Sequence, residues 1–244
     1  MVRKVIFMFE LISECNRYMK RCGIPYAICG GWALDLFMNK ETRSHSDIDI
    51  IVFDEDRKIS VDFMVDNGWS IFEHKFDWID NRKANSYLRQ ISSNDEKLAS
   101  LFGVWALKPN CSLIDLDVKV KSDNSGIYDY EIMSNEQSKF DFLEIMFCKC
   151  KNGYYIYDEK KNIKRELGKT ILDNDNIPYL APEIILFFIS DPAYQKSEYH
   201  REKNQSDYMN VAPLLVNESK GWLMDALEII YPEGNARLEQ LRLL

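Results

Sequence analysis

The sequence of 244 residues lacks any apolar run that approaches the roughly 20 residues needed to cross a bilayer, so we expect no membrane segment. The first residues hold a short apolar stretch, but acids follow at Glu10 and Glu14 without a small-residue cleavage site, which argues against a secretory signal. The chain has only three histidines and six scattered cysteines, and their spacing does not form a zinc site. We therefore expect reduced thiols and a cytoplasmic protein.

Basic residues are also in deficit, with 31 Lys and Arg against 39 Asp and Glu and a net charge of −8. A protein that coats nucleic acid needs a local excess of Lys and Arg, and no run of basic residues is present, so we expect no nucleic-acid partner. A nucleotide ligand remains compatible with an acidic chain, because bound metal ions can supply the positive charge.

The order of apolar and turn-forming residues predicts alternating helices and strands in the first part of the chain, and thus an α/β (α+β) fold. Residues 75–110 have no clear pattern apart from a polar loop at 92–96. The expected helices cover 7–21, 32–38 and 56–66, and the expected strands cover 26–29, 47–53, 69–73, 111–120, 127–128 and 154–157.

The pattern changes after Ile177 and Pro178, where helical spacing replaces strand spacing. We place a boundary there and expect a catalytic domain over 1–178 and a helical C-terminal subdomain over 179–244. The helices expected in that subdomain cover 181–189, 206–216, 219–230 and 235–244.

Two features between residues 29 and 53 predict the chemistry of the protein. Gly30 and Gly31 lie between a strand and a helix, where glycine lets the backbone approach a ligand and the helix start offers free N–H groups to a phosphate. Asp47 and Asp49 are two residues apart at the start of an Ile- and Val-rich strand, so their carboxylates share one face.

A second strand, around 114–118, again alternates acids with apolar residues and contributes Asp115 and Asp117. If the two strands are neighbours, the carboxylates converge and repel one another unless a cation lies between them. Oxygen ligands of this kind suit a divalent metal. The metal and the nearby glycine turn together predict phosphoryl or nucleotidyl transfer, with two metal ions assisting an in-line displacement.

Arg43 and His45 directly precede the two acids. From the residues alone, two interpretations are equally supported. Their side chains contact a triphosphate, or they order the loop that leads into the strand.

The motif formed by Gly30-Gly31-Trp32-Ala33-Leu34-Asp35 and Thr42-Arg43-Ser44-His45-Ser46-Asp47-Ile48-Asp49-Ile50 resembles the signature of the DNA-polymerase-β-like nucleotidyltransferase superfamily. More narrowly, it resembles the aminoglycoside (2″) adenylyltransferases and the lincosamide nucleotidyltransferases. The resemblance implies a mixed β-sheet flanked by helices, with a helical C-terminal subdomain. It also implies transfer of a nucleoside monophosphate from ATP or another NTP to a hydroxyl of a small acceptor.

The resemblance assigns roles to individual residues. It implies that Asp47, Asp49 and Asp115 hold Mg²⁺, two ions in all, and that Asp115 helps to deprotonate the acceptor. The general base stays open between Asp115, Asp117 and an acid of the C-terminal subdomain. Gly30, Gly31, Arg43 and His45 are the candidate nucleotide-binding residues in this motif.

The segment 201–208 resembles a helix start of the same family, in which Lys203 would contact the triphosphate. Asn204 replaces the acid expected after that lysine, and the alternative is that Lys203 and Asp207 only initiate and cap a helix.

An aminoglycoside is the expected acceptor, because a chain of net charge −8 attracts polycations. A lincosamide is the alternative, as is a protein or tRNA acceptor of a toxin–antitoxin pair. A degenerate nucleotide-binding module is disfavoured, because all three expected acids are present. The motifs leave the oligomeric state unassigned.

Overall fold

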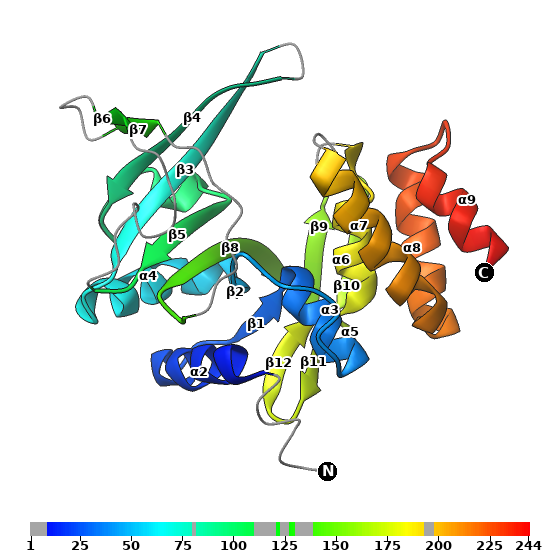
Figure 1. Ribbon diagram of the computed structural model, residues 1–244, viewed down its shortest axis with the longest axis horizontal. Helices are drawn as coiled ribbons and strands as arrows, with labels where there is room; N and C mark the ends of the chain where they lie inside the picture. Colours follow the sequence, from blue (N-terminus) through cyan, green and yellow to red (C-terminus); the bar gives the residue numbers. More distant parts are fainter. Residues whose placement is uncertain (1–8, 80–81, 110–120, 123–126, 130–138, 193–197) are drawn as a thin grey trace. The chain divides into compact units, whose positions relative to one another are not determined.

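The computed structural model describes residues 9–79, 82–109, 121–122, 127–129, 139–192 and 198–244 (Figure 1). The chain divides into two units, one made of residues 1–27 and 43–148 and the other of residues 28–42 and 149–244. The domain boundary expected at residue 178 stays a prediction. Among the described residues, no helix combines the length and apolar content that a membrane crossing requires.

The first unit is built on a mixed β-sheet in the strand order β2-β8-β5-β3-β4-β7-β6. Strands β2 and β8 run parallel, whereas β5, β3, β4, β7 and β6 are joined by antiparallel pairings. The strands are β2 (Asp49–Phe53), β3 (Ser70–Ile79), β4 (Arg82–Ile91), β5 (Gly103–Leu107), β6 (Lys121–Ser122), β7 (Ile127–Asp129) and β8 (Phe142–Lys151), and β1 (Tyr26–Cys29) begins here.

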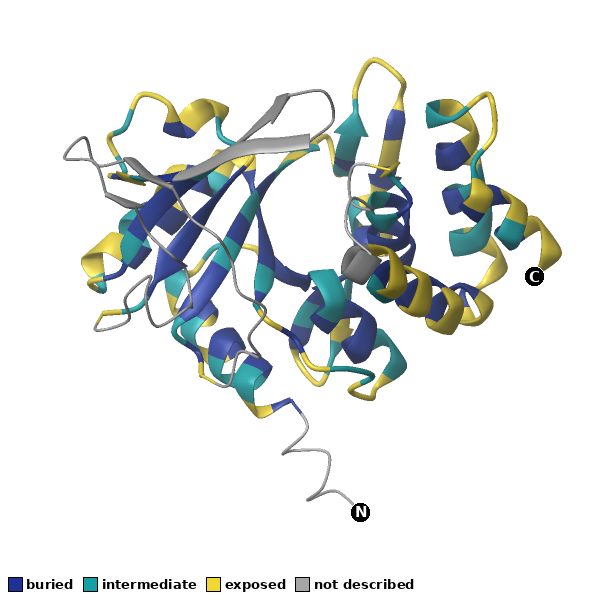
Figure 2. Cartoon of the chain, turned by 45° about the horizontal axis from the view of Figure 1, so that its top comes forward, coloured by how far each residue is buried: buried dark blue, intermediate teal, exposed yellow. Residues whose placement is uncertain are grey.

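Two helices, α2 (Glu10–Met19) and α4 (Arg57–Asp66), pack together in this unit through aromatic side chains. The Tyr18 ring contacts the rings of Phe63 and Trp69 at centroid distances of 5.2 and 5.3 Å. Buried residues concentrate in the strands of the sheet (Figure 2), so the sheet forms most of this core. Short 3₁₀ turns cover Lys20–Cys22, Asp54–Asp56 and Leu98–Ser100.

The second unit combines small sheets with a group of helices. The end of β1 pairs in parallel with β12 (Ile177–Leu180), which pairs with β11 (Ile171–Asn174), while β9 (Tyr154–Asp158) joins β10 (Ile163–Glu166) to the end of β8. The helices are α3 (Gly30–Met38), α5 (Leu167–Thr170), α6 (Pro182–Ile189), α7 (Glu198–Val211), α8 (Asn217–Ile230) and α9 (Ala236–Leu243), with a 3₁₀ turn at Ala212–Leu214.

These elements confirm the predicted α/β (α+β) class, a mixed sheet with flanking helices and a helical C-terminal part. The polar loop at 92–96 is also confirmed, since no helix or strand covers it. The expected strand at 111–120 lies outside the described residues.

The helix predicted over 206–216 is wrong in its bounds, because α7 covers Glu198–Val211. Its buried residues Asn204, Asp207, Tyr208 and Val211 follow helical spacing, but two of them are polar. A search for apolar periodicity therefore finds only the second half of the helix.

An ion-pair network links β3, β4 and the loop after β4. The Arg89 Nε donates to Glu73 Oε2 at 2.7 Å, and its two terminal nitrogens donate to the Asp95 carboxylate at 2.6 and 3.2 Å. Glu73 is 1% exposed, so its charge depends on this partner. The hydrogen bonds from Arg89, with the backbone N–H of Lys97, hold the pKa of the Asp95 carboxyl below its ordinary value.

This lowered pKa predicts how stability depends on pH. The Asp95 carboxylate stabilises the fold above the ordinary pKa of an aspartate, about 4, and loses this contribution as pH falls through the lower folded value. We expect Asp95→Asn to cost about 1 kcal/mol of unfolding free energy at pH 7 and nothing once the wild-type carboxyl is protonated. Urea unfolding from pH 7 to pH 2 measures this, with the exposed neighbour Glu96→Gln as the control. If Asp95→Asn lowers the unfolding free energy equally at pH 7 and pH 2, this prediction is wrong.

Candidate active site

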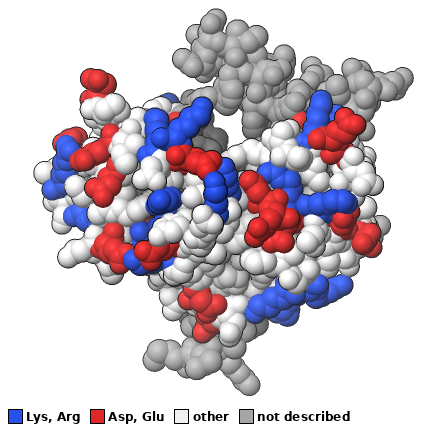
Figure 3. All heavy atoms as spheres, turned by 180° about the vertical axis from the view of Figure 1, so that it is seen from behind, with Lys and Arg blue, Asp and Glu red and all other residues white. Residues whose placement is uncertain are grey.

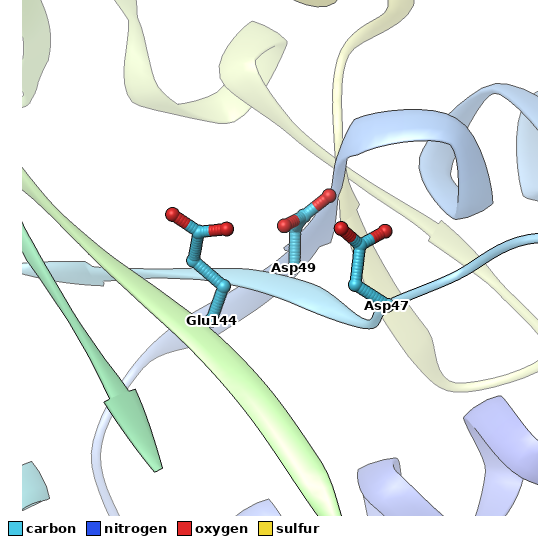
Figure 4. Close-up of side chains that lie close together, drawn as sticks. All are labelled: Asp47, Asp49 and Glu144. Atoms are coloured by element: carbon cyan, nitrogen blue, oxygen red, sulfur yellow. The ribbon is translucent and has the colours of Figure 1, made fainter. Parts of the chain in front are cut away.

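Three carboxylates meet on one face of the first unit's sheet. Asp49 is the first residue of β2, Asp47 precedes it by two positions, and Glu144 lies opposite Asp49 on β8. Their carboxylate oxygens lie within 4.8 Å of one another, and all three residues are half-buried. Figure 4 shows the three side chains turned to the same side of the strands.

The local sequence explains this convergence. Ile48 and Ile50 alternate with the two aspartates and are fully buried, as are Leu143 and Ile145 on either side of Glu144. Because side chains alternate across a strand, burying the apolar residues on one face turns the acids to the other. The pairing of β2 with β8 is extended by a hydrogen bond of 3.0 Å from Glu144 N to Ile48 O.

The donor set suits a hard divalent cation. Three carboxylates supply only oxygen ligands, which Mg²⁺ prefers, and their oxygens are close enough to share one ion. Three like charges at this separation also repel one another, and a cation relieves that repulsion. The cluster therefore fits the metal expected from Asp47 and Asp49.

The third carboxylate of this cluster was not expected from the sequence. Asp115, to which the resemblance assigned this place, and Asp117 both lie outside the described residues. Glu144 has the same signal that revealed the aspartates, an acid within an alternating apolar segment, but β8 was not recognised as a strand. The metal-binding role expected of Asp115 therefore stays a prediction, and Glu144 is added as a candidate ligand.

A histidine that stacks on a tryptophan lies beside the Glu144 carboxylate. His74 Nε2 lies 3.2 Å from Glu144 Oε1. The imidazole of His74 stacks on the indole of Trp105, with ring centroids 5.3 Å apart and planes 23° apart. Neither residue was singled out from the sequence, because neither belongs to a recognisable motif.

The glycine turn lies in the second unit, at the start of α3. Gly30 has φ +62°, a conformation that favours glycine, and Gly31 follows it as the second residue of the helix. Their position at a helix start is the one predicted for contact with a phosphate.

The loop after α3 is held by Asp35, the last acid of the glycine motif. Asp35 is fully buried, and its Oδ1 accepts hydrogen bonds from Thr42 N at 3.1 Å and Thr42 Oγ1 at 2.7 Å. This carboxylate therefore holds the start of the segment that leads to Asp47 and Asp49.

Arg43 and His45 contact each other in the first unit. Arg43 Nη1 lies 3.1 Å from His45 Nδ1 and donates to Ser44 O at 3.1 Å, and His45 is buried. These contacts favour the interpretation that the two side chains order the loop. Contact with a triphosphate stays a prediction for both residues.

Lys203 is half-buried inside α7 rather than at its start. The alternative in which Lys203 and Asp207 initiate and cap a helix is therefore wrong, because the helix begins at Glu198. A nucleotide-binding role for Lys203 stays a prediction.

One family model matches part of the chain. Residues 11–91 match the family model described as aminoglycoside-2″-adenylyltransferase. The matched segment contains the glycine turn, Asp47 and Asp49. It confirms the resemblance drawn from these motifs and the enzyme class, an adenylyltransferase.

No curated protein matches the chain. Among solved structures, a crystal structure of ANT(2″)-Ia in complex with adenylyl-2″-tobramycin is 13% identical, with a TM-score of 0.45 over 91% of this chain and 95% of that chain. A solution structure of the antibiotic-resistance factor ANT(2″)-Ia is 14% identical, with a TM-score of 0.35 over 100% and 91% of the two chains. At TM-scores below 0.5, these two similarities carry no argument about function.

Proposed function

Because residues 11–91 match the aminoglycoside-2″-adenylyltransferase family model, we propose that this chain transfers AMP from ATP to a hydroxyl of an aminoglycoside. The observation that carries the proposal is the meeting of Asp47, Asp49 and Glu144 within 4.8 Å. In the reaction, the acceptor oxygen bonds to the α-phosphorus, the bond from that phosphorus to the bridging oxygen breaks, and pyrophosphate leaves.

The three carboxylates would hold Mg²⁺, with two ions expected as in an in-line displacement. When bound by these carboxylates, a divalent cation would supply neutralisation of phosphate charge and a lower pKa of the acceptor hydroxyl. The strands fix the carboxylates before substrate binds, so little reorganisation is needed during the reaction. The proton of the acceptor hydroxyl passes to a carboxylate, for which Asp115, Asp117 and an acid of the C-terminal part are the candidates.

The nucleotide would be held by backbone N–H groups of the turn at Gly30 and Gly31. We assign Arg43, His45 and Lys203 to the triphosphate in the same proposal. ATP is the NTP expected from the family description, which is that of adenylyltransferases.

The charge of the chain supports a polycationic acceptor. The net charge of −8 attracts aminoglycosides through its long-range field. On the face seen in Figure 3, the Lys and Arg side chains of the described residues are interspersed with Asp and Glu. A nucleic-acid acceptor would need a continuous basic surface, which this face does not offer.

A panel assay tests the proposal. We expect Mg²⁺-dependent pyrophosphate release from ATP with aminoglycosides that carry a 2″-hydroxyl, and none with the same compounds lacking that hydroxyl. If pyrophosphate is released with lincosamides and not with aminoglycosides, the acceptor is a lincosamide. No release with either class would favour a protein or tRNA acceptor, and equal ATP binding with Mg²⁺ or EDTA would contradict the metal site.

A further inference from the structure

His74 reaches the metal cluster from two strands away. It lies on β3, Glu144 lies on β8, and β5 runs between these strands. The His74 side chain is 13% exposed and the Glu144 side chain 22%, so their contact of 3.2 Å is partly shielded from water. A hydrogen bond in such a place is stronger than one at the open surface.

The residue between them holds the imidazole in place. Trp105 on β5 lies opposite Glu144 in the strand pairing and is 3% exposed. Its indole stacks against the His74 ring and also packs edge-on against Phe142, at a centroid distance of 5.2 Å. Packing from these rings therefore fixes where Nε2 of His74 points.

The chemistry of the pair defines the direction of the hydrogen bond. An ionised carboxylate can only accept, so His74 Nε2 carries the hydrogen and donates it to Glu144 Oε1. This bond occupies one oxygen of Glu144 and restricts the rotation of its carboxylate. Figure 4 shows one oxygen of this carboxylate on the side of Asp49 and Asp47.

We propose that His74 is a positioning residue that orients the Glu144 carboxylate for metal binding. This role rests on the proposed function, because it presupposes a cation between Glu144 and the two aspartates. Hydrogen bonds to metal ligands hold those ligands in the binding orientation, and losing one typically weakens metal affinity by about 10–100-fold.

Two substitutions at this position separate hydrogen bonding from packing. His74→Phe keeps an aromatic ring to stack on Trp105 but removes the donor. His74→Gln places an amide N–H near the site of Nε2 and loses the ring. If His74 acts only through packing, the phenylalanine variant is the better substitute, and if it positions Glu144, the glutamine variant is.

The measurement is Mn²⁺ binding to the full chain with a non-hydrolysable ATP analogue, followed by electron paramagnetic resonance of the free ion. We expect His74→Phe to weaken Mn²⁺ binding by about 10–100-fold and His74→Gln to bind close to the wild-type value. Thermal unfolding in EDTA shows whether each variant is folded.

The outcomes separate this inference from the function on which it rests. Wild-type Mn²⁺ affinity in His74→Phe, or equal weakening in both variants, overturns the role of His74 and leaves the metal site intact. If Mn²⁺ binds the wild-type chain no better than it binds Asp49→Asn, the metal site itself fails and this inference fails with it.

Discussion

Replacing Asp47 or Asp49 with asparagine is expected to lower the rate of AMP transfer by about 10³-fold or more, since metal ligation stabilises a transition state by several kcal/mol. Both side chains face the same point as Glu144, so an amide at either position removes one anionic ligand from a set of three. Pyrophosphate release under saturating ATP and acceptor measures the effect. Retained activity in both variants would contradict the metal assignment.

The same variants should not unfold. Without a cation, the three carboxylates repel one another, so neutralising one of them relieves repulsion. We expect the melting temperature of Asp49→Asn in EDTA to equal or exceed that of the wild-type chain, and the stabilisation by Mg²⁺ to be lost. Asp66→Asn, an exposed acid at the end of α4, is the matched control that should keep both activity and stabilisation by Mg²⁺.

Glu183 is expected to be the acid whose loss destabilises the second unit most. It lies in the first turn of α6, is 1% exposed, and forms an ion pair with Arg165 of β10, which is 6% exposed. Ser219 of α8 donates to Glu183 Oε1 at 2.9 Å and accepts from Arg165 Nη2 at 3.2 Å. This buried group therefore connects a strand with two helices.

Removing one partner leaves the other charge buried without compensation. We expect Glu183→Leu to cost about 3–5 kcal/mol of unfolding free energy, which corresponds to a fall in melting temperature of roughly 10 °C. The double variant Arg165→Met with Glu183→Leu should recover most of the loss, because an apolar pair of similar volume replaces the ion pair.

Calorimetry of the single and double variants measures this coupling. Glu218→Gln, which breaks the exposed ion pair with Lys169, is the control and should leave the unfolding free energy nearly unchanged. If Glu183→Leu is as stable as the double variant, leaving Arg165 without its partner costs nothing, and this prediction is wrong.

The local parts of the site could be predicted from the sequence, and the long-range parts could not. Asp47 and Asp49 alternate with isoleucines within one short segment, and the glycine turn lies between a strand and a helix. Both features can therefore be recognised from a few consecutive residues. Glu144 becomes part of the cluster only through the pairing of β2 with β8, and alternation alone does not say which strands are neighbours.

The same reason explains the gaps in the fold prediction. Residues 75–110 show no clear apolar periodicity. They nevertheless contain the end of β3 and the whole of β4 and β5. Gly103 begins β5, and a Cβ there would lie 2.7 Å from Ile145 O, so the sequence uses a residue of low strand propensity where two backbones come close. Trp105, two residues later, stacks on His74 of the neighbouring strand β3, and this strand neighbour cannot be read from the local sequence.

The parallel pairing that places Asp49 opposite Glu144 also limits where the chain can change length during evolution. A deletion of one residue inside β8 would send Leu143 or Ile145 to the face of the aspartates and carry Glu144 into the apolar interior. An insertion in the loop at 92–96 leaves this alternation untouched. Related enzymes that gain or lose residues should therefore do so between the strands, while the spacing within β2 and β8 stays constant.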